Sequence, residues 1–564
     1  MAQGVAVQEA DAPRRTAEPV ARPLLLFAAF AALSLLVYRA ALHGPFLSDD
    51  FGYIVGNPYT SGLGWANLRA IFDPFGPARL YTANYAPIHL LLTALERQIF
   101  ADDPFGYHVV NLLLHAANAT LLVALLRRSG LPVAGALAAG AVFLLHPANV
   151  EAVAWVSQLK SDLALAFVFG ALLLHPRRPA AAAALFALGL LSKASAAFAW
   201  PMACALAWAR CRTADGARRE AAWLALWGLL LAAFALPEYA SFAGAGEAES
   251  TAFAGAGEQL RTIAAIGARY LWMAATSLGV AAFQEPEPAR SWLDPRWLAA
   301  IPVGAVLAWR AATTLRARKP EAAWWIGAAA AWAPVSQVFP FLNPIADRYL
   351  YFMLPGLIGG ASLWLDSRLQ SVALRRAAVA VAAALAAVFS FGTGERARLW
   401  RDETLLLLDA AKHYPDGATA HYLNARRAAN RSDAALAVAE LREAWVRGLD
   451  RFMAFEQDPV LAPIRDTAEF RGLIRDMAGA WLDRARQRGR GTPADLLVMA
   501  QAHVARGEYA PAAALLEQAL AAGGPFEAVL RDELAAVRMQ ERGATDSGSP
   551  IPLPEETPHR PPGT

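Results

Sequence analysis

Long apolar stretches follow one another through residues 23–394, and they constrain the fold more than any other feature of the chain. The first stretch runs from Leu24 to Leu42 and follows a polar segment that contains Arg14, Arg15 and Arg22. Because a helix of about 20 apolar residues crosses a bilayer, each stretch is a candidate membrane span. The later stretches lie near residues 106–126, 132–145, 161–175, 180–191, 195–209, 221–236, 298–315, 321–339, 349–365 and 377–392.

The composition agrees with a membrane protein, because 56% of the 564 residues are hydrophobic and only 18% are charged. A basic segment before an apolar stretch also describes a signal peptide, but no small-x-small cleavage site follows here. We therefore predict an uncleaved first helix whose N-terminus lies in the cytoplasm. The two cysteines, Cys204 and Cys211, do not make a disulfide framework. We expect no nucleic-acid partner.

Basic clusters occur at every second connection between the apolar stretches, which is the pattern of cytoplasmic loops. These clusters are Arg127-Arg128, Arg177-Arg178, Arg210 to Arg219, Arg310 to Lys319, and Arg368 to Arg376. The pattern predicts about eleven spans. It places the loops 43–105, 146–160, 192–194, 237–297 and 340–348 outside the cytoplasm, provided that residues 263–283 lie on the membrane surface. The C-terminal region is then also extracytoplasmic.

The first outer loop carries Asp49 and Asp50 directly after the first span. Carboxylates are expensive within a bilayer, so a pair at its edge lies where a lipid headgroup is close. A helix cap formed by Ser48 and the aspartates is the structural alternative. His89, at the other end of this loop, suits either packing or substrate binding.

The second outer loop is the most polar stretch between spans, running from His146 to Asp162. Glu151, Trp155, Gln158 and Asp162 have spacings that place them on one face of a continuous helix. The carboxylates of Glu151 and Asp162 then face one cavity, unless this face of the helix is simply exposed to solvent. His146 and Glu151 lack the spacing of a metal motif, and we expect no dedicated metal site.

Two later outer loops each carry a cation. Lys193 lies between two apolar stretches, and it either reaches a lipid headgroup or holds a phosphate. Arg348 follows Asp347 at the outer end of a span, against the positive-inside bias. A guanidinium there suits phosphate oxygens, and a local pair with Asp347 is the alternative.

The long apolar stretches end near residue 395, and the sequence pattern changes there. Residues 395–540 predict paired amphipathic helices, with spacings near Ala502, Gly507 and Tyr509 that are typical of tetratricopeptide repeats. Such solenoids bind peptides or proteins. Residues 1–22 are expected to form a cytoplasmic tail, 23–394 the membrane domain, and 541–564 a disordered tail.

These segments, in this order, resemble the GT-C glycosyltransferases, and most closely the transmembrane-and-tetratricopeptide-repeat O-mannosyltransferases (TMTC) and their bacterial relatives. The matching pieces are Asp49-Asp50 with Ile54 and Asn57, His146-Pro147 to Asp162, Leu191-Ser192-Lys193, Ala346 to Tyr351, and Trp400 with Asp402. The chain departs from the family at Ala86, where an arginine is usual, and at Ser161, which separates Lys160 from Asp162.

The resemblance implies an all-α, GT-C-like bundle followed by a short repeat solenoid. It also implies transfer of mannose or a similar hexose from a polyprenyl-phosphate sugar to a hydroxyl outside the cytoplasm, on a protein or glycan, with inversion. Asp49 or Asp50 would be the base, Lys193 and Arg348 would hold the phosphate, and no cofactor would be required. The remaining expected substrate-binding residues are Glu151, Asp162, Asp347, Tyr351, His89 and His146.

The expected location is a bacterial-type plasma membrane, with a protein partner on the repeats. Two other classes of function stay open at this point. A flippase or transporter would need ionisable residues near the bilayer midplane and internal repeats. A membrane assembly scaffold would use only the repeat domain, and it would not need the polar residues of the outer loops.

Overall fold

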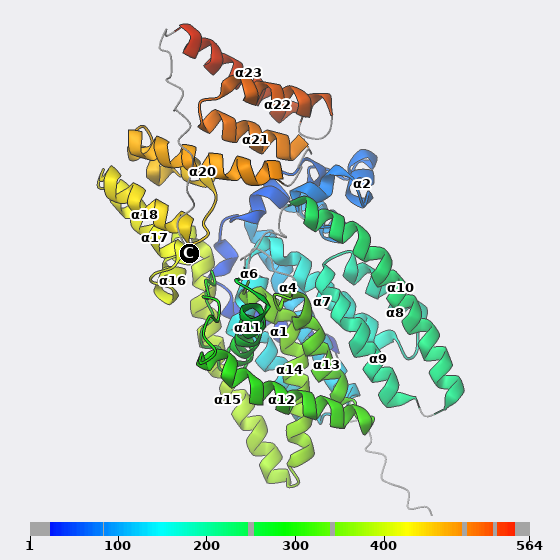
Figure 1. Cartoon of the computed structure of the whole chain (residues 1–564). Coiled ribbons are helices and arrows are strands. Elements are labelled where there is room, and N and C mark those ends of the chain that lie inside the picture. The colour runs from blue at the N-terminus through cyan, green and yellow to red at the C-terminus, as the bar shows by residue number, and fades with distance from the viewer. Residues whose placement is uncertain are drawn as a thin grey trace, which may run out of the picture. The chain divides into compact units, whose positions relative to one another are not determined.

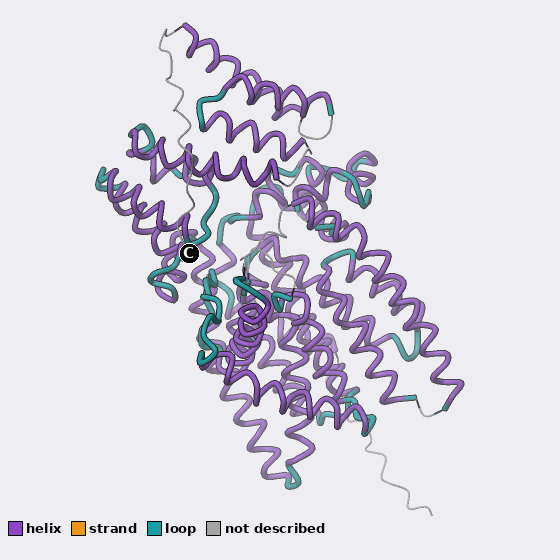
Figure 2. The backbone as a smooth tube through the Cα atoms, viewed as in Figure 1, coloured by secondary structure: helices purple, strands orange, loops and turns teal. Residues whose placement is uncertain are grey.

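The structure, a computed structural model, describes residues 23–82, 84–211, 213–245, 253–338, 344–487, 493–522 and 527–546. Every regular element in these ranges is a helix, and they contain no strand (Figure 2). The all-α class predicted from the sequence is therefore confirmed. The chain divides into two compact units, one ending at Asp409 and one beginning at Ala410. The first unit thus extends past residue 395, where the composition changes.

The first unit is a helix bundle (Figure 1). Its α-helices are α1 (Pro23–Val37), α2 (Trp65–Phe72), α3 (Pro87–Phe100), α4 (Pro104–Arg128), α5 (Val133–Leu144), α6 (Val150–Ala154), α7 (Leu159–Leu174), α8 (Pro179–Leu190), α9 (Ala199–Arg210), α10 (Ala214–Ala245), α11 (Ala256–Thr276), α12 (Pro295–Arg316), α13 (Glu321–Trp332), α14 (Asp347–Arg368) and α15 (Val372–Ala397). Several begin at proline, whose missing N–H is not needed in a first turn. The helix α16 (Glu403–His413) crosses the boundary between the units.

Five helical segments in the described ranges are long and apolar enough to cross a membrane, which indicates a multi-pass membrane protein. They are Pro104–Arg128, Val156–Leu174, Ala214–Ser241, Pro295–Arg316 and Val372–Arg401. The pair Val133–Leu144 and Pro147–Ala154, bent by 51°, adds a sixth if it counts as one span. The expected number of about eleven includes 12-residue helices such as α8 and α13, which are short for a full crossing. That number stays a prediction, as does the surface position of α11.

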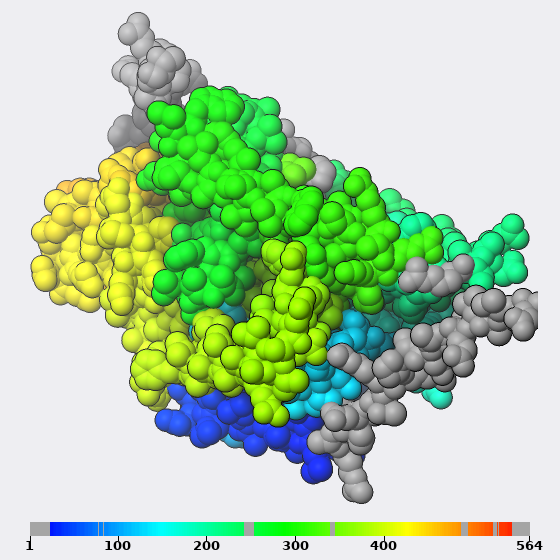
Figure 3. Space-filling model, turned by 90° about the horizontal axis from the view of Figure 1, so that it is seen from below, coloured from blue at the N-terminus to red at the C-terminus, as the bar shows by residue number. Residues whose placement is uncertain are grey.

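Basic residues gather at one end of this bundle. At the end of α4, Arg128 donates a hydrogen bond to the carbonyl of Leu173 near the end of α7. Arg318, after α12, donates to the carbonyl of Cys211 after α9 at 2.8 Å. Figure 3 views the molecule from this end, where the segments coloured green to yellow-green, α12 to α15, lie at the surface. These contacts place basic residues from different connections at the same end of the bundle.

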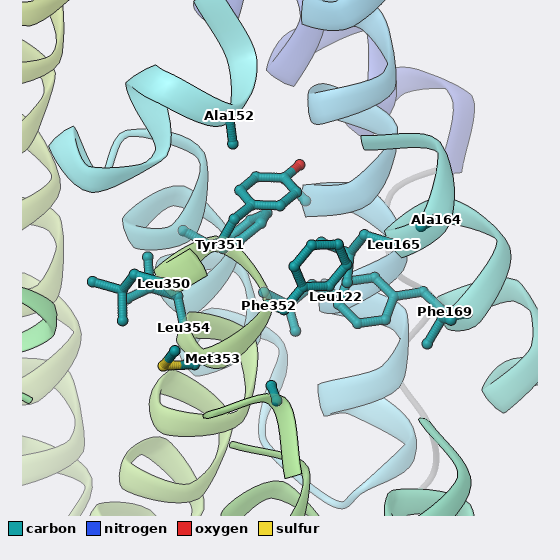
Figure 4. Packing of buried hydrophobic residues seen from close by; sticks show 14 of the residues in the cluster. Leu122, Ala152, Ala164, Leu165, Phe169, Leu350, Tyr351, Phe352, Met353 and Leu354 are labelled. Carbon is teal, nitrogen blue, oxygen red and sulfur yellow. The ribbon is translucent and has the colours of Figure 1, made fainter. Parts of the chain in front are cut away.

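The core of the bundle forms where α4, α7 and α14 meet. Figure 4 shows Phe352 of α14 close to Leu122 of α4 and to Leu165 of α7. Close approach of α14 to α13 depends on glycine, because a Cβ on Gly359 would lie 2.3 Å from Cε3 of Trp324. Small residues at helix contacts are the usual means of tight packing within a membrane. This packing fixes α14, whose first residues reach the polar end of the bundle.

The second unit consists of consecutive helices that pack against their neighbours along the chain (Figure 1). These are α17 (Ala418–Ala429), α18 (Ala434–Val446), α19 (Phe452–Gln457), α20 (Ala468–Gln487), α21 (Pro493–Ala505), α22 (Tyr509–Ala521) and α23 (Glu527–Asp546). Helical pairs are what the sequence predicts here, and their assignment as tetratricopeptide repeats stays a prediction. The helix α23 continues into the predicted tail, whose remainder lies outside the described residues, as do residues 1–22.

Candidate active site

Asp50 connects the first outer loop to the second. Its side chain is buried, with 1% exposed. Oδ2 accepts a hydrogen bond from the backbone N–H of Leu47 at 2.9 Å, and Oδ1 accepts one from the N–H of Ser157 at 2.8 Å. Burial raises the pKa of Asp50 to about 7, although these hydrogen bonds act in the opposite direction. Oδ2 therefore fixes the turn within the first loop, and Oδ1 ties that loop to the second outer loop.

Asp49 differs from its neighbour, because its side chain is exposed. Ser48 has a φ of 51°, and this left-handed turn leads into the short helical segment that begins at Phe51. The negative charge of Asp49 reaches Arg348. Burial opposes the charge of that guanidinium, but Glu151 and, more weakly, Asp49 raise its pKa. Of the two aspartates, Asp49 is the one that a molecule outside the bundle can reach.

Arg348 pairs with Glu151 and not with the adjacent Asp347. One carboxylate oxygen of Glu151 accepts the backbone N–H of Arg348 at 2.8 Å, and the other binds its guanidinium. The guanidinium also lies over the rings of Trp155 and Tyr349, with its carbon 5.5 and 5.0 Å from their centroids. The start of α14 is thereby fixed against α6. Arg348 thus already has a full counter-charge.

Asp347 points to a different part of the bundle. It is buried, and it accepts a hydrogen bond from Nε2 of Gln284 at 2.7 Å. A guanidinium nitrogen of Arg396 lies 3.8 Å from its other oxygen. These contacts tie the loop before α12 to the start of α14 and to α15. We assign Asp347 a positioning role.

The polar block of the second outer loop is not one continuous helix. Trp155 has extended backbone angles, φ −80° and ψ 120°, between α6 and the short turn Val156–Gln158. The carbonyls of Trp155 and Val156 accept the N–H groups of Gln158 and Leu159 in this turn. Nδ2 of Asn111 also donates to both carbonyls, at 3.2 and 3.3 Å. The expectation that Glu151, Trp155, Gln158 and Asp162 share one helical face is therefore wrong.

Asp162 and Tyr351 lie together inside the bundle, and both are fully buried. The hydroxyl of Tyr351 donates to Oδ1 of Asp162. Nδ1 of His115 lies 3.0 Å from that hydroxyl, and Nδ2 of Asn118 donates to it at 3.1 Å. This network joins the middle of α4 to the first turns of α7 and α14. The side chains of Asp162 and Tyr351 therefore do not reach solvent in this structure.

Lys193 and Lys160 form a second polar group near the ends of α7 and α8. Nζ of Lys193 donates to Oγ of Ser161 at 2.7 Å and to Oε1 of Gln158 at 3.2 Å. Nζ of Lys160 donates to the hydroxyl of Tyr53 at 2.9 Å and lies 4.4 Å from the centre of its ring. The sequence prediction singled out Lys193 and omitted Lys160. The position of Lys160 next to Ser161, in the polar block of the second loop, could have identified it from the sequence.

The two histidines expected at the site differ in their surroundings. His146 caps the turn Pro147–Asn149, because its Nδ1 accepts the N–H of Ala148 at 3.2 Å, and its ring packs on Phe389 at 4.6 Å between centroids. His89 is buried against the ring of Tyr53, 5.7 Å between centroids. Its Nδ1 has no hydrogen-bond partner within the described part of the chain. His89 thus adjoins the lysine pair, whereas His146 has a packing role.

In the ranges that the structure describes, no group of three or more His, Cys, Asp or Glu side chains is arranged to hold a metal ion. The site instead combines one exposed carboxylate with several cations. Asp49, Arg348 and the lysine pair are brought to one end of the bundle by the contacts of Asp50, Glu151 and Tyr53. A carboxylate beside cations suits proton removal next to a phosphate leaving group.

The chain is similar in part to protein O-mannosyl-transferases of animals. It is 37% identical over 129 residues to Tmtc1 of Drosophila melanogaster, which is 22% of this chain and 15% of that protein. It is 34% identical over 137 residues to Tmtc2 of the same species, covering 23% of this chain and 14% of that protein. With human TMTC1 the identity is 30% over 138 residues, which is 23% of this chain and 15% of that protein.

The resemblance expected from the sequence is therefore confirmed over part of the chain. The matches span a small fraction of the length of these relatives. No family model matches the chain.

Proposed function

We propose that this protein is a membrane glycosyltransferase that moves mannose or a similar hexose from a polyprenyl phosphate to an acceptor hydroxyl, with inversion. The acceptor class that fits best is a serine or threonine of a protein, since the similar animal proteins are named protein O-mannosyl-transferases. The observation that carries the proposal is the exposed carboxylate of Asp49 beside the buried Asp50 and near Arg348. No cofactor beyond the lipid-linked sugar is needed.

In the proposed reaction, Asp49 takes the proton of the acceptor hydroxyl. The hydroxyl oxygen forms a bond to the anomeric carbon on the face opposite the phosphate. The bond from that carbon to the phosphate oxygen breaks, and the electron pair leaves with the lipid phosphate. Positive charge on the protein stabilises the departing phosphate, which needs no strong acid to protonate it. Asp50 holds the loop that carries Asp49.

We place this end of the bundle on the extracytoplasmic side of a bacterial-type plasma membrane. The support is the collection of basic residues at the opposite end, since cytoplasmic loops are rich in lysine and arginine. In this arrangement the membrane lipid donor enters from the side and the acceptor enters from outside. The second unit would bind the acceptor protein or another protein partner through its paired helices.

The test is sugar transfer by the purified full-length chain in lipid nanodiscs, with polyprenyl phosphate mannose and a serine/threonine peptide. Asp49→Asn should lower the rate by about two to four orders of magnitude, the usual contribution of a general base. Asp102→Asn is the matched control, because it also removes one exposed carboxylate of an adjacent pair in the same loop. Full activity of a folded Asp49→Asn protein contradicts the proposed role. A wild-type chain with no transfer to peptide or glycan favours a scaffold or a flippase.

A further inference from the structure

Three arginines from three separate connections lie together at the basic end of the bundle. Arg128 ends α4, Arg177 lies between α7 and α8, and Arg210 ends α9, and all three residues are exposed. Arg128 is fixed to the end of α7 by its hydrogen bond to the carbonyl of Leu173. The positive charges of Arg210 and Arg177 are close enough to repel that of Arg128. The fold therefore holds these guanidinium groups together against their mutual repulsion.

A single carboxylate lies among the three arginines. Oε2 of Glu220, near the start of α10, lies 3.3 Å from a guanidinium nitrogen of Arg210. The same oxygen lies 2.7 Å from Nε2 of the buried His175, so Arg210 shares its counter-charge. In the part of the chain that the structure describes, neither Arg128 nor Arg177 forms an ion pair with a carboxylate. Three positive charges thus face one negative charge, and the cluster is suited to bind an anion.

The cluster lies at the level where membrane-spanning helices end. The apolar segments Pro104–Arg128 and Val156–Leu174 end here, and Ala214–Ser241 begins here. Trp208 on α9 is 48% exposed, and the guanidinium carbon of Arg318 lies 4.1 Å from the centre of its ring. Exposed tryptophan is characteristic of the level of the lipid headgroups. The arginines are therefore within reach of lipid phosphates.

The outer surface of α10 near the cluster is apolar. This helix packs against α8 and α9, and it leaves Leu226 and Leu229 exposed (Figure 1). In a helix that spans a membrane, the acyl chains of the bilayer cover such side chains. The headgroups of these lipids then lie at the level of the arginines. The anion that fits the cluster is thus the phosphate of a lipid that is already in the membrane.

We propose that Arg128, Arg177 and Arg210 bind the phosphate of an anionic phospholipid in the leaflet next to this end of the bundle. Guanidinium groups form paired hydrogen bonds with phosphate oxygens, and basic pockets between membrane helices bind such headgroups. The bound phosphate offsets the repulsion among the arginines and joins the ends of three helices. The proposal is independent of sugar transfer, because the candidate active site lies at the other ends of α7 and α14.

The test measures lipid binding to the purified full-length protein in a neutral detergent by native mass spectrometry. Phosphatidylglycerol is compared with phosphatidylcholine, which has the same phosphate and acyl chains but no net charge. The wild type should bind phosphatidylglycerol at least tenfold more tightly. Arg177→Gln and Arg128→Gln should each weaken that binding about tenfold, because each removes a charged hydrogen-bond donor, and should leave phosphatidylcholine binding unchanged.

Arg316→Gln is the matched control, because it removes an exposed arginine at the same end of the bundle but outside the cluster. It should bind phosphatidylglycerol as the wild type does. Equal weakening by Arg177→Gln and Arg316→Gln overturns the proposed site, since it would mean that the lipid responds only to the total charge of this end. Equal binding of the two lipids by the wild type overturns it as well.

A soluble phosphate is the other source of the same chemistry. Glycerol phosphate at the same concentration as the lipid should not displace phosphatidylglycerol, and complete displacement would assign the cluster to a soluble anion. Because Arg177 is exposed, its replacement should not prevent folding, and the Tm without lipid checks this. Phosphatidylglycerol should raise the Tm of the wild type more than that of Arg177→Gln, since a ligand stabilises the state that binds it. Equal increases in Tm contradict the proposal.

Discussion

Two adjacent aspartates in the first outer loop have acquired different environments. Asp50 is buried and accepts two backbone hydrogen bonds, whereas Asp49 is exposed. The sequence predicts that neighbouring side chains point in different directions, and it favoured Asp49 as the base only through the family resemblance. It could not show that Ser157, more than 100 residues later, donates to Asp50. Only the folded chain distinguishes the two carboxylates.

The buried Asp50 makes stability depend on pH. Its pKa rises from an ordinary 3.8 to about 7 in the folded protein, so the folded state keeps a proton that the unfolded state has lost. The free energy of unfolding should therefore fall as pH rises from about 4 to about 7, by at most about 1.4 kcal/mol per pH unit from this group. Asp50→Asn should remove this part of the dependence.

The measurement compares the Tm of wild type and Asp50→Asn across that pH range in one detergent. As pH rises, the Tm of the wild type should fall steadily relative to the Tm of Asp50→Asn. Asp102→Asn, which alters an exposed carboxylate in the same loop, should follow the wild-type curve. Parallel curves for wild type and Asp50→Asn would show that Asp50 is ionised equally in both states.

At the scale of elements, the helical class was predictable from the apolar stretches, but the break within the second outer loop was not. Helical spacing placed Glu151 and Asp162 on one face, and no glycine marks an interruption between them. At the break, Asn111 on another helix donates a hydrogen bond to the carbonyl of Trp155. Tertiary hydrogen bonds of this kind override local periodicity. A sequence separation of 107 residues likewise hid the approach of Lys160 to Tyr53.

The contact between α13 and α14 should be highly sensitive to side-chain size. In Gly359→Ala, the new Cβ would lie 2.3 Å from the buried ring of Trp324, so one helix must shift. Overpacking of this kind typically removes about 1–3 kcal/mol of stability. Gly304→Ala in α12 is the matched control, because nothing lies within 4 Å of its Cβ and the site is exposed. The control should be neutral or slightly more stable, since alanine favours a helix more than glycine does.

Thermal unfolding of the two variants in the same detergent measures this contrast. A loss of Tm in Gly359→Ala alone supports the tight packing of α14, and with it the fixed position of Arg348 at the start of that helix. Equal Tm values for both variants would mean that α14 and α13 are loosely packed.

At the scale of the whole molecule, basic clusters from several connections meet at one end of the bundle. The sequence predicted alternating basic clusters, and the contacts of Arg128 and Arg318 bring several of them together. What the sequence could not supply is the number of crossings, because helices such as α8 and α13 are too short to decide by length alone. The prediction of which side of the membrane the candidate site faces therefore rests on the distribution of basic residues.

Sidedness can be measured in the full-length protein by labelling single cysteines with a membrane-impermeant maleimide. In a background where Cys204 and Cys211 are replaced by serine, Lys319→Cys reports on the basic end and Asp416→Cys on the second unit, and both positions are exposed. We expect Asp416→Cys to react in intact cells and Lys319→Cys to react only after the membrane is permeabilised, because the positive-inside bias holds the basic end in the cytoplasm. Labelling of both positions from the same side would mean one crossing more or one fewer between residues 319 and 416 than we expect. Labelling of Lys319→Cys alone in intact cells would mean that the bundle has the opposite orientation. Asp49 would then lie in the cytoplasm, away from an extracytoplasmic acceptor.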